Sequence, residues 1–219
     1  MVWNYIKDEL QPKGIVAISA HFTSTDESKI LVDISEKPIL IHDFPDHPLY
    51  DNFEYTWDLQ GSPELGERVI TTLKDFGIDA MGVHRGCDHG VWVPFRRGMK
   101  SSADIPIVSV SMFSYHCMPS YVKLGEALSS LRDDGIVIVA SGKLVHNLAM
   151  RRYFKNKASP TFVKEFDDEA ERIVSVGAAG DDEGTKIFDM YATSMSWGSF
   201  AFGLPNHTRL AQYDNDMTS

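Results

Sequence analysis

The sequence predicts an α/β fold, in which a central, mostly parallel or mixed sheet is flanked by helices in a single domain. Three observations predict it. The continuous apolar run at residues 136–140 and the largely apolar run at 14–20 are typical of strands buried on both faces, and residues 105–111 predict a further strand. Amphipathic segments with helical spacing lie between these runs. The chain of 219 residues can form one substantial core, so we expect one domain over residues 1–219.

Charge and composition limit the partners and the compartment. The formal net charge of −10 argues against a nucleic-acid or anionic-membrane partner, because both are polyanions. The two cysteines, Cys87 and Cys117, cannot form a disulfide framework and fit a reducing compartment. The first ten residues carry charges and no long apolar run, and no run elsewhere approaches the roughly 20 residues of a membrane span. We therefore expect a cytoplasmic protein.

The first part of the chain predicts two strands and a long loop. The apolar spacing within residues 3–10 predicts a short amphipathic helix, and the strand at 14–20 follows it. Residues 30–35 predict another strand. Residues 38–61 are loop-like and rich in aromatic side chains. This composition favours an ordered loop that forms a wall over a pocket.

The next segment opens with a helix start signal. Ser62 is expected to be the N-cap and Pro63 the first helical residue. One face of this helix is apolar and is expected to point inward; it comprises Leu65, Val69, Leu73 and Phe76. Residues 78–83 predict a weaker strand, and residues 84–90 predict a glycine-rich polar turn.

The second half repeats the alternation. A helix is expected at residues 120–132, between the strands at 105–111 and 136–140, and the latter strand is expected at the centre of a parallel sheet. Another amphipathic helix is expected to start at Ser159-Pro160. The segment 195–202 predicts an edge strand with a bulge near Gly198.

Four of the eight histidines follow predicted strands within a few residues: His21, His89, His116 and His146. Ligands bind outside the carboxyl ends of strands in open α/β sheets, so these side chains are expected to meet at one edge. Imidazole is a common metal ligand and proton shuttle. The pattern predicts a metal or acid–base site, although a lone loop histidine is more often a structural or surface residue. No Walker loop, GxGxxG or GxSxG motif occurs, which argues against nucleotide binding and serine hydrolysis.

Seven sequence blocks together resemble one enzyme family, the class III extradiol ring-cleavage dioxygenases, and are most similar to its 4,5-DOPA dioxygenase-like branch. They occur in the family's order between about residues 3 and 203. The blocks are SAHF (19–22), IHDF (41–44), GSPELGERV (61–69), DHGVWVP (88–94), ADIPIVSVS (103–111), LRDDGIVIVASGKLVHNL (131–148) and GAAGDD (177–182).

The resemblance implies a metal-dependent enzyme that opens the ring of a catechol such as DOPA with dioxygen. It implies one metal ion per chain, iron(II) or zinc. His21 of SAHF would be a metal ligand, and His146 would be a further ligand or the acid–base residue that deprotonates the catechol. His89 of DHG would be a catalytic residue that lines the pocket and assists proton transfer or dioxygen binding. His42 and Asp43 of IHDF would lie near the substrate.

Two departures from the family pattern bear on this activity. The family's HGSP-like motif, which follows its first strand, and its PEH-like motif each carry a histidine, and neither motif is found here. His21 and His146 alone would hold a metal weakly, because an iron oxygenase site needs three protein ligands on one face. An exposed strand edge in place of the family's first strand invites pairing with another chain, which leaves two alternatives open: a homo-oligomer or an unstable truncated protein.

Three functions remain open. The sequence favours a ring-opening dioxygenase, possibly impaired by the missing motifs. The alternative is a catalytically inactive relic of the family that binds a small aromatic ligand or a partner chain. A metal-dependent hydrolase on the same scaffold is least favoured, because the sequence has no carboxylate-rich metal motif.

Overall fold

The chain divides into two compact units, one comprising Val2–Gly142 and the other Lys143–Ser219 together with Met1. The computed structural model describes residues 5–43, 56–99, 105–114, 118–142, 147–155, 157–166, 182, 184–192 and 195–202. Within these ranges, no helix has the length and apolar character that crossing a membrane would require.

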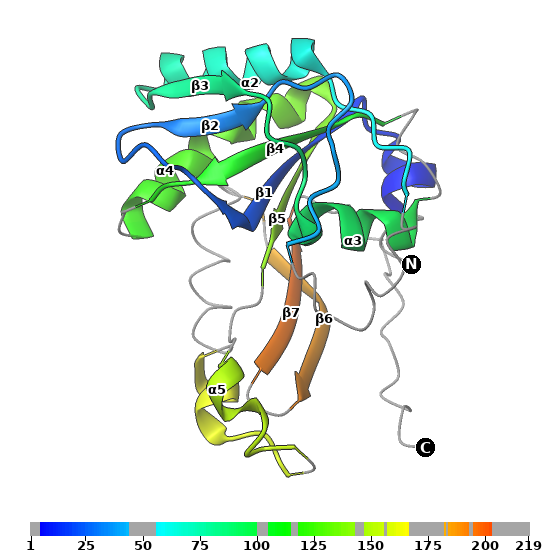
Figure 1. Ribbon diagram of the computed structural model, residues 1–219, viewed down its shortest axis with the longest axis vertical. Coiled ribbons are helices and arrows are strands. Elements are labelled where there is room, and N and C mark those ends of the chain that lie inside the picture. The colour runs from blue at the N-terminus through cyan, green and yellow to red at the C-terminus, as the bar shows by residue number, and fades with distance from the viewer. Residues whose placement is uncertain are drawn as a thin grey trace. The chain divides into compact units, whose positions relative to one another are not determined.

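The first unit is built on a five-stranded mixed sheet with the strand order β3-β2-β4-β1-β5 (Figure 1). β1 is parallel to both β4 and β5, β2 is parallel to β3, and β2 is antiparallel to β4. The predicted α/β class with a mixed sheet is therefore confirmed. The strands are β1 (Gly14–Thr23), β2 (Ile30–Asp33), β3 (Ala80–Val83), β4 (Ile107–Met112) and β5 (Ile136–Ser141).

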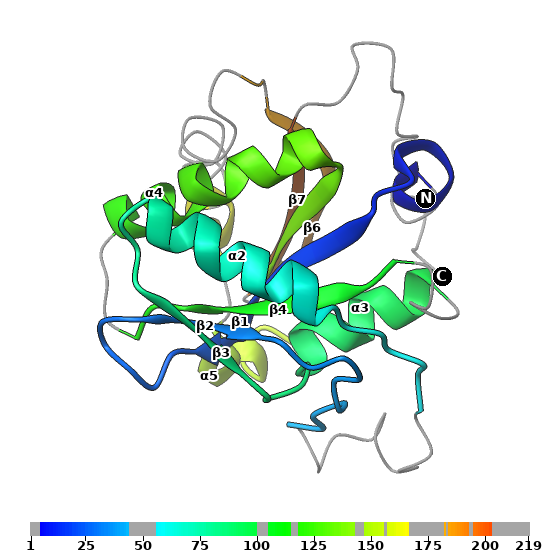
Figure 2. The same cartoon turned by 90° about the horizontal axis from the view of Figure 1, so that it is seen from above.

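Helices cover both faces of this sheet. Figure 2 shows α2 (Pro63–Asp75) and α4 (Met118–Ser129) together over one face. α3 (His89–Gly98) packs against the opposite face. Because successive strand residues alternate between faces, Val16 of β1 joins the core under α2 and α4, while Ile15 and Ala17 join the core under α3. A π-helical turn (Tyr5–Leu10) precedes β1, and a 3-10 helix (Ser130–Asp134) follows α4.

The second unit contains two short helical segments and a hairpin among its described residues. The helix is α5 (Leu148–Arg151), and residues 161–166 are also helical. β6 (Gly184–Ala192) and β7 (Met195–Phe202) form the antiparallel hairpin. β7 confirms the predicted strand at 195–202, but the register shifts in β6, between Lys186 and Phe188, and not at Gly198.

The strand at 136–140 is present as β5, but its predicted place at the centre of the sheet is wrong. β5 lies at the edge of the five described strands, and β1 occupies the interior next to it. Only Ile136 of β5 is buried, whereas Ile15, Val16 and Ala17 of β1 are inaccessible to solvent. An apolar run reports burial but does not report which strands lie on either side.

α3 begins where the sequence predicts only a polar turn. Asp88 caps the helix, and its Oδ1 accepts a hydrogen bond from the Gly90 N–H at 3.0 Å. Gly90 and Pro94 both disfavour helix, which hides the segment from propensity arguments. Burial of Trp92 and Phe95 against the sheet outweighs that cost.

Asp88 also joins the start of α3 to the end of β1. Its buried carboxylate accepts hydrogen bonds from Ser19 Oγ at 2.6 Å and from Arg85 Nη1 at 2.9 Å. Arg85 Nη2 in turn donates to the backbone carbonyl of His21 at 3.0 Å. A Cβ atom at Gly90 would lie 2.6 Å from Ser19 Oγ, so only glycine allows this close approach.

A loop segment, residues 39–43, is strapped to the residues before α3. Leu40 forms a parallel bridge with Cys87, and the Ile41 N–H donates to the Cys87 carbonyl at 2.8 Å. Trp92 Nε1 donates to the Ile41 carbonyl at 3.0 Å. This strap places the residues that follow Ile41 beside the first turn of α3.

The sequence places two residues, Leu73 and Phe76, on the same helix face, but the packing predicts that their replacement by alanine lowers the free energy of unfolding by different amounts. Leu73 is completely buried, whereas Phe76 is the C-cap of α2 and is 45% exposed, so its expected inward position is wrong. Leu73→Ala should lower the free energy of unfolding by about 2–5 kcal/mol. Phe76→Ala should change it by about 0.5 kcal/mol or less. Urea denaturation of both variants measures this difference, and equal costs would contradict the packing.

A second prediction concerns Asp88. Asp88→Ala should lower the free energy of unfolding by about 3 kcal/mol, because Ser19, the Gly90 N–H and the Arg85 guanidinium lose their shared acceptor. Asp79→Ala, at an exposed carboxylate, is the matched control and should have little effect. Denaturation of both variants measures the costs. A loss below about 1 kcal/mol in Asp88→Ala would refute the proposed importance of this carboxylate.

Candidate functional site

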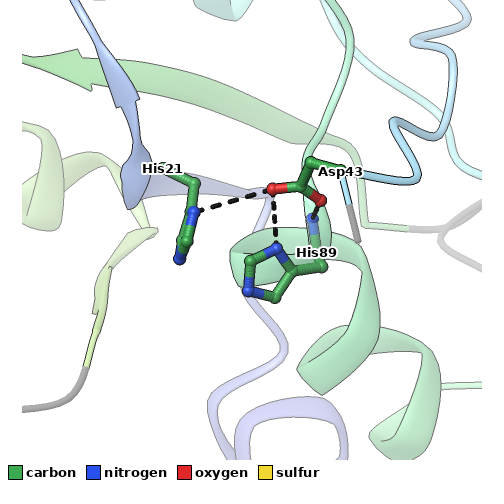
Figure 3. A group of neighbouring side chains, drawn as sticks. All are labelled: His21, Asp43 and His89. Carbon is green, nitrogen blue, oxygen red and sulfur yellow. Dashed lines mark hydrogen bonds and ion pairs between the residues drawn. The ribbon is translucent and has the colours of Figure 1, made fainter. Parts of the chain in front are cut away.

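Three polar side chains from separate parts of the chain meet at the carboxyl end of β1. His21 comes from β1, Asp43 from the strapped segment, and His89 is the first residue of α3. Figure 3 shows the Asp43 carboxylate reaching toward both imidazoles. One potential ligand atom from each residue lies within 4.8 Å of those of the other two. The fold thus brings together nitrogen and oxygen donors that are far apart in sequence.

The Asp43 carboxylate is shared between the two rings. Oδ2 lies 2.7 Å from His89 Nδ1 and 3.6 Å from His21 Nδ1 (Figure 3). Oδ1 accepts a hydrogen bond from the His89 backbone N–H at 3.2 Å. The two rings meet edge to face with their centroids 4.1 Å apart. A carboxylate that accepts from Nδ1–H of a neutral imidazole leaves the lone pair of that ring on Nε2.

Electrostatics keep this carboxylate ionised. Burial raises the pKa of Asp43, but hydrogen bonds from the His89 side chain and backbone, together with electrostatic attraction to His89, lower it by more. The pKa of Asp43 therefore lies below its ordinary value. The His21 side chain is 42% exposed, whereas those of Asp43 and His89 are 24% and 23% exposed. The cluster is consequently open to a solute on the His21 side.

The donor set suits a transition metal. Two imidazole nitrogens and one carboxylate oxygen bind iron(II) or zinc readily. Ligand atoms on adjacent positions of an octahedral or tetrahedral centre lie about 3.0–3.4 Å apart, given metal–ligand bonds of roughly 2.1 Å. The separations of His89 Nδ1 and His21 Nδ1 from Asp43 Oδ2, 2.7 and 3.6 Å, lie on either side of that range. These residues could therefore hold a metal ion after adjustment of their side chains.

The structure brings together three of the residues that the sequence singles out and separates another. His21, Asp43 and His89 form the cluster. The ring of His42 lies instead against Trp92, with centroids 5.1 Å apart. His146 lies outside the described residues, as do His47, His116 and His207. Of the four histidines expected to converge, the described pair does so.

His84, for which the sequence favours a structural role, lies on the surface. Its Nδ1 is 3.3 Å from Ser35 Oγ, and its side chain does not belong to the three-residue cluster.

Sequence reasoning missed the residues that support the cluster. Ser19, Arg85 and Asp88 hold the backbone that presents His21 and His89. Asp88 had a detectable signal, because an aspartate directly before the run HGVWV matches a helix N-cap. The roles of Ser19 and Arg85 depend on contacts across the fold and have no local signal.

Cys87 lies near the cluster but has a different character. Its thiol is fully buried, and burial, followed by the carboxylates of Asp33 and Asp88, raises its pKa far above the usual range. A neutral, buried thiol is a poor metal ligand and nucleophile. Its part is structural, through the backbone bridge to Leu40.

Several known proteins are similar in sequence to this chain. A 4,5-DOPA dioxygenase extradiol from Beta vulgaris is 36% identical over 138 residues, which cover 62% of this chain and 50% of that protein. A 4,5-DOPA dioxygenase extradiol-like protein from Schizosaccharomyces pombe is 32% identical over 164 residues, which cover 74% of this chain and 54% of that protein. The chain thus spans about half the length of these relatives.

A third relative and a solved structure agree with this picture. The 4,5-DOPA dioxygenase extradiol of Escherichia coli K12 is 32% identical over 160 residues, which cover 72% of this chain and 56% of that protein. The crystal structure of an uncharacterized Escherichia coli K12 protein superposes with a TM-score of 0.69 at 23% identity. The superposition covers 91% of this chain and 90% of the Escherichia coli chain, and it supports the fold alone.

The family model itself matches most of the sequence. Residues 2–181 match the model described as the catalytic LigB subunit of aromatic ring-opening dioxygenase. This range contains His21, Asp43 and His89 and the whole described sheet of the first unit. The chain therefore belongs to the LigB family of aromatic ring-opening dioxygenases.

Proposed function

We propose that this chain opens the aromatic ring of a catechol, such as DOPA, in a metal-dependent reaction with dioxygen. The observation that carries the proposal is the meeting of His21, Asp43 and His89 at the carboxyl end of β1 in a LigB-family chain. Relatives at 32–36% identity are named 4,5-DOPA dioxygenases, which supports a catechol as the substrate class.

The residues have distinct parts in this proposal. His21 is a ligand of the single metal ion, which is iron(II) for ring cleavage, with zinc as the other candidate. When bound, the metal supplies positive charge that lowers the pKa of the catechol hydroxyls and holds the diol and dioxygen together. His146 takes a proton from the catechol as the acid–base residue. His42, whose ring lies against Trp92, contacts the substrate.

The reaction needs no further reductant. One ring carbon–carbon bond beside the diol breaks, the oxygen–oxygen bond breaks, and both oxygen atoms enter the product. The electrons that reduce dioxygen come from the ring carbons, which become an aldehyde and a carboxylate. The protein's task is to bind the diol and move its protons, which fits a site of imidazoles and one carboxylate.

The experiment loads the purified chain with iron(II) or zinc without oxygen, and then adds oxygen and a panel of catechols that includes DOPA. We expect a yellow ring-opened product and one dioxygen consumed for each catechol in the iron(II)-loaded protein. Hydroquinone, whose hydroxyls stand opposite each other and cannot chelate one metal, should not react. Absorbance and an oxygen electrode measure the two quantities.

Two outcomes decide between the open functions. His146→Ala should abolish turnover while leaving the fold unchanged, and full turnover in that variant would remove His146 from the mechanism. A metal-loaded chain that consumes no oxygen with any catechol would refute the enzyme. In that case saturable binding of a catechol would favour the alternative, an inactive family member that binds a small aromatic ligand.

A further inference from the structure

We infer that Ser141, at the carboxyl end of β5, is a positioning residue for His89. Its hydroxyl replaces a hydrogen-bond donor that the first turn of α3 lacks, and it thereby fixes the backbone that carries the His89 imidazole. The inference rests on the proposed function, because it takes His89 to be a catalytic residue of that reaction. Ser141 acts through His89 and is not itself a catalytic residue.

The first turn of α3 contains a carbonyl that has no regular donor within the helix. In an α-helix, the carbonyl of each residue accepts a hydrogen bond from the N–H four residues later. Four residues after Gly90 stands Pro94, which lies inside α3 and has no N–H. The proline ring also crowds the carbonyl four residues before it. The Gly90 carbonyl therefore needs a donor from outside the helix.

Ser141 supplies that donor. Its Oγ donates a hydrogen bond to the Gly90 carbonyl oxygen at 2.5 Å, although the two residues are 51 positions apart in the sequence. Ser141 is the last residue of β5, which is paired with β1 along its whole length. The hydrogen bond therefore attaches α3 to the sheet at the residue that directly follows His89.

A second serine holds the other side of His89. Ser19 of β1 is the register partner of Ser141, and its Oγ donates to the Asp88 carboxylate at 2.6 Å. Asp88 directly precedes His89, and Gly90 directly follows it. Two adjacent strands therefore each fix one chain neighbour of His89, and this restricts the backbone positions from which its imidazole can reach the site.

The rest of α3 is held in a different way. Trp92 and Phe95 are buried against the sheet, so the body of the helix is expected to stay in place without Ser141. Loss of the hydrogen bond to Gly90 should therefore release mainly the first turn, which carries His89. A displacement of about 1 Å is enough to slow a reaction between aligned groups about 100-fold.

The first part of the test measures catechol cleavage by variants of the full chain loaded with iron(II). Ser141→Ala removes the donor and should lower kcat about 10–100-fold, as the loss of a supporting partner behind a site typically does, with KM nearly unchanged. Ser141→Thr keeps the hydroxyl and should retain most of kcat. Ser109→Ala is the matched control: Ser109 is a buried serine of β4 whose Oγ has no hydrogen-bond partner among the described residues, so its loss should leave kcat unchanged.

Pro94→Ala is the decisive change. Alanine at this position restores an N–H four residues after Gly90, so the helix itself can supply the donor. The double variant Ser141→Ala/Pro94→Ala should therefore recover most of the kcat that Ser141→Ala alone loses. Two changes that act independently would instead give effects that add in free energy.

The second part of the test uses the metal-free chain without substrate. Nuclear magnetic resonance of isotope-labelled histidine, with the His89 imidazole signals assigned by their loss in His89→Gln, reports the surroundings of this ring. The signals should shift in Ser141→Ala and return toward their wild-type positions in the double variant. Thermal unfolding shows that each variant is folded at the temperature of measurement. If Ser141→Ala does not fold, Ser141→Cys, whose thiol is a weaker donor, replaces it throughout.

The outcomes separate this inference from the proposed function. If the wild type cleaves catechols, an unchanged kcat in Ser141→Ala or a double variant as slow as Ser141→Ala alone would overturn the inference and leave the function standing. A loss of kcat without a shift of the His89 signals would overturn it as well, because Ser141 would then act elsewhere. If the His89 signals respond as expected but no catechol is cleaved, Ser141 still positions His89 and the proposed function fails.

Discussion

The buried carboxylate of Asp88 receives hydrogen bonds from the strand that carries His21, from the loop before α3 and from the first turn of α3 itself. Burying a carboxylate away from water costs free energy unless its oxygens accept hydrogen bonds and an opposite charge lies nearby. Here the Arg85 guanidinium supplies the opposite charge, and it also holds the His21 carbonyl and lies 4.2 Å from the centre of the Phe22 ring. The spacing between the two imidazoles therefore follows from how one buried charge is satisfied.

Asp43 reaches the same place by a different route. Its segment belongs to no described sheet, and the bridge between Leu40 and Cys87 and the Trp92–Ile41 hydrogen bond attach it to α3. Asp33 supports the other side of this strap by accepting from the Gly86 N–H, at a glycine whose φ of +96° few other residues tolerate. The cluster thus combines two donors on regular elements with one on a loop. The loop donor has the weakest support and is the member most sensitive to changes nearby.

The parts of this fold that the sequence predicts are those with local causes. The Ser62-Pro63 start of α2 depends on side-chain capping within four residues, and the strands are predicted from apolar runs within single segments. α3 was hidden because Gly90 and Pro94 disfavour helix, and its stability comes from burial against distant strands. The position of His21 after a strand predicts a place at the sheet edge. Its pairing with Asp43 depends on the Leu40–Cys87 bridge, which no local pattern encodes.

The parallel arrangement of β1 has a consequence for how the protein forms. Ile15 pairs with Ile107 on one side and with Val137 on the other, so this early strand has both its neighbours late in the chain. The long stretches of chain between these strands must close into loops before the strands can pair. The entropy lost in that closure slows folding. During synthesis, the segment that carries His21 has to remain without its final hydrogen-bonding partners until β5 has left the ribosome. Its apolar residues are exposed to mispairing throughout that interval, which makes chaperone binding to this nascent segment advantageous.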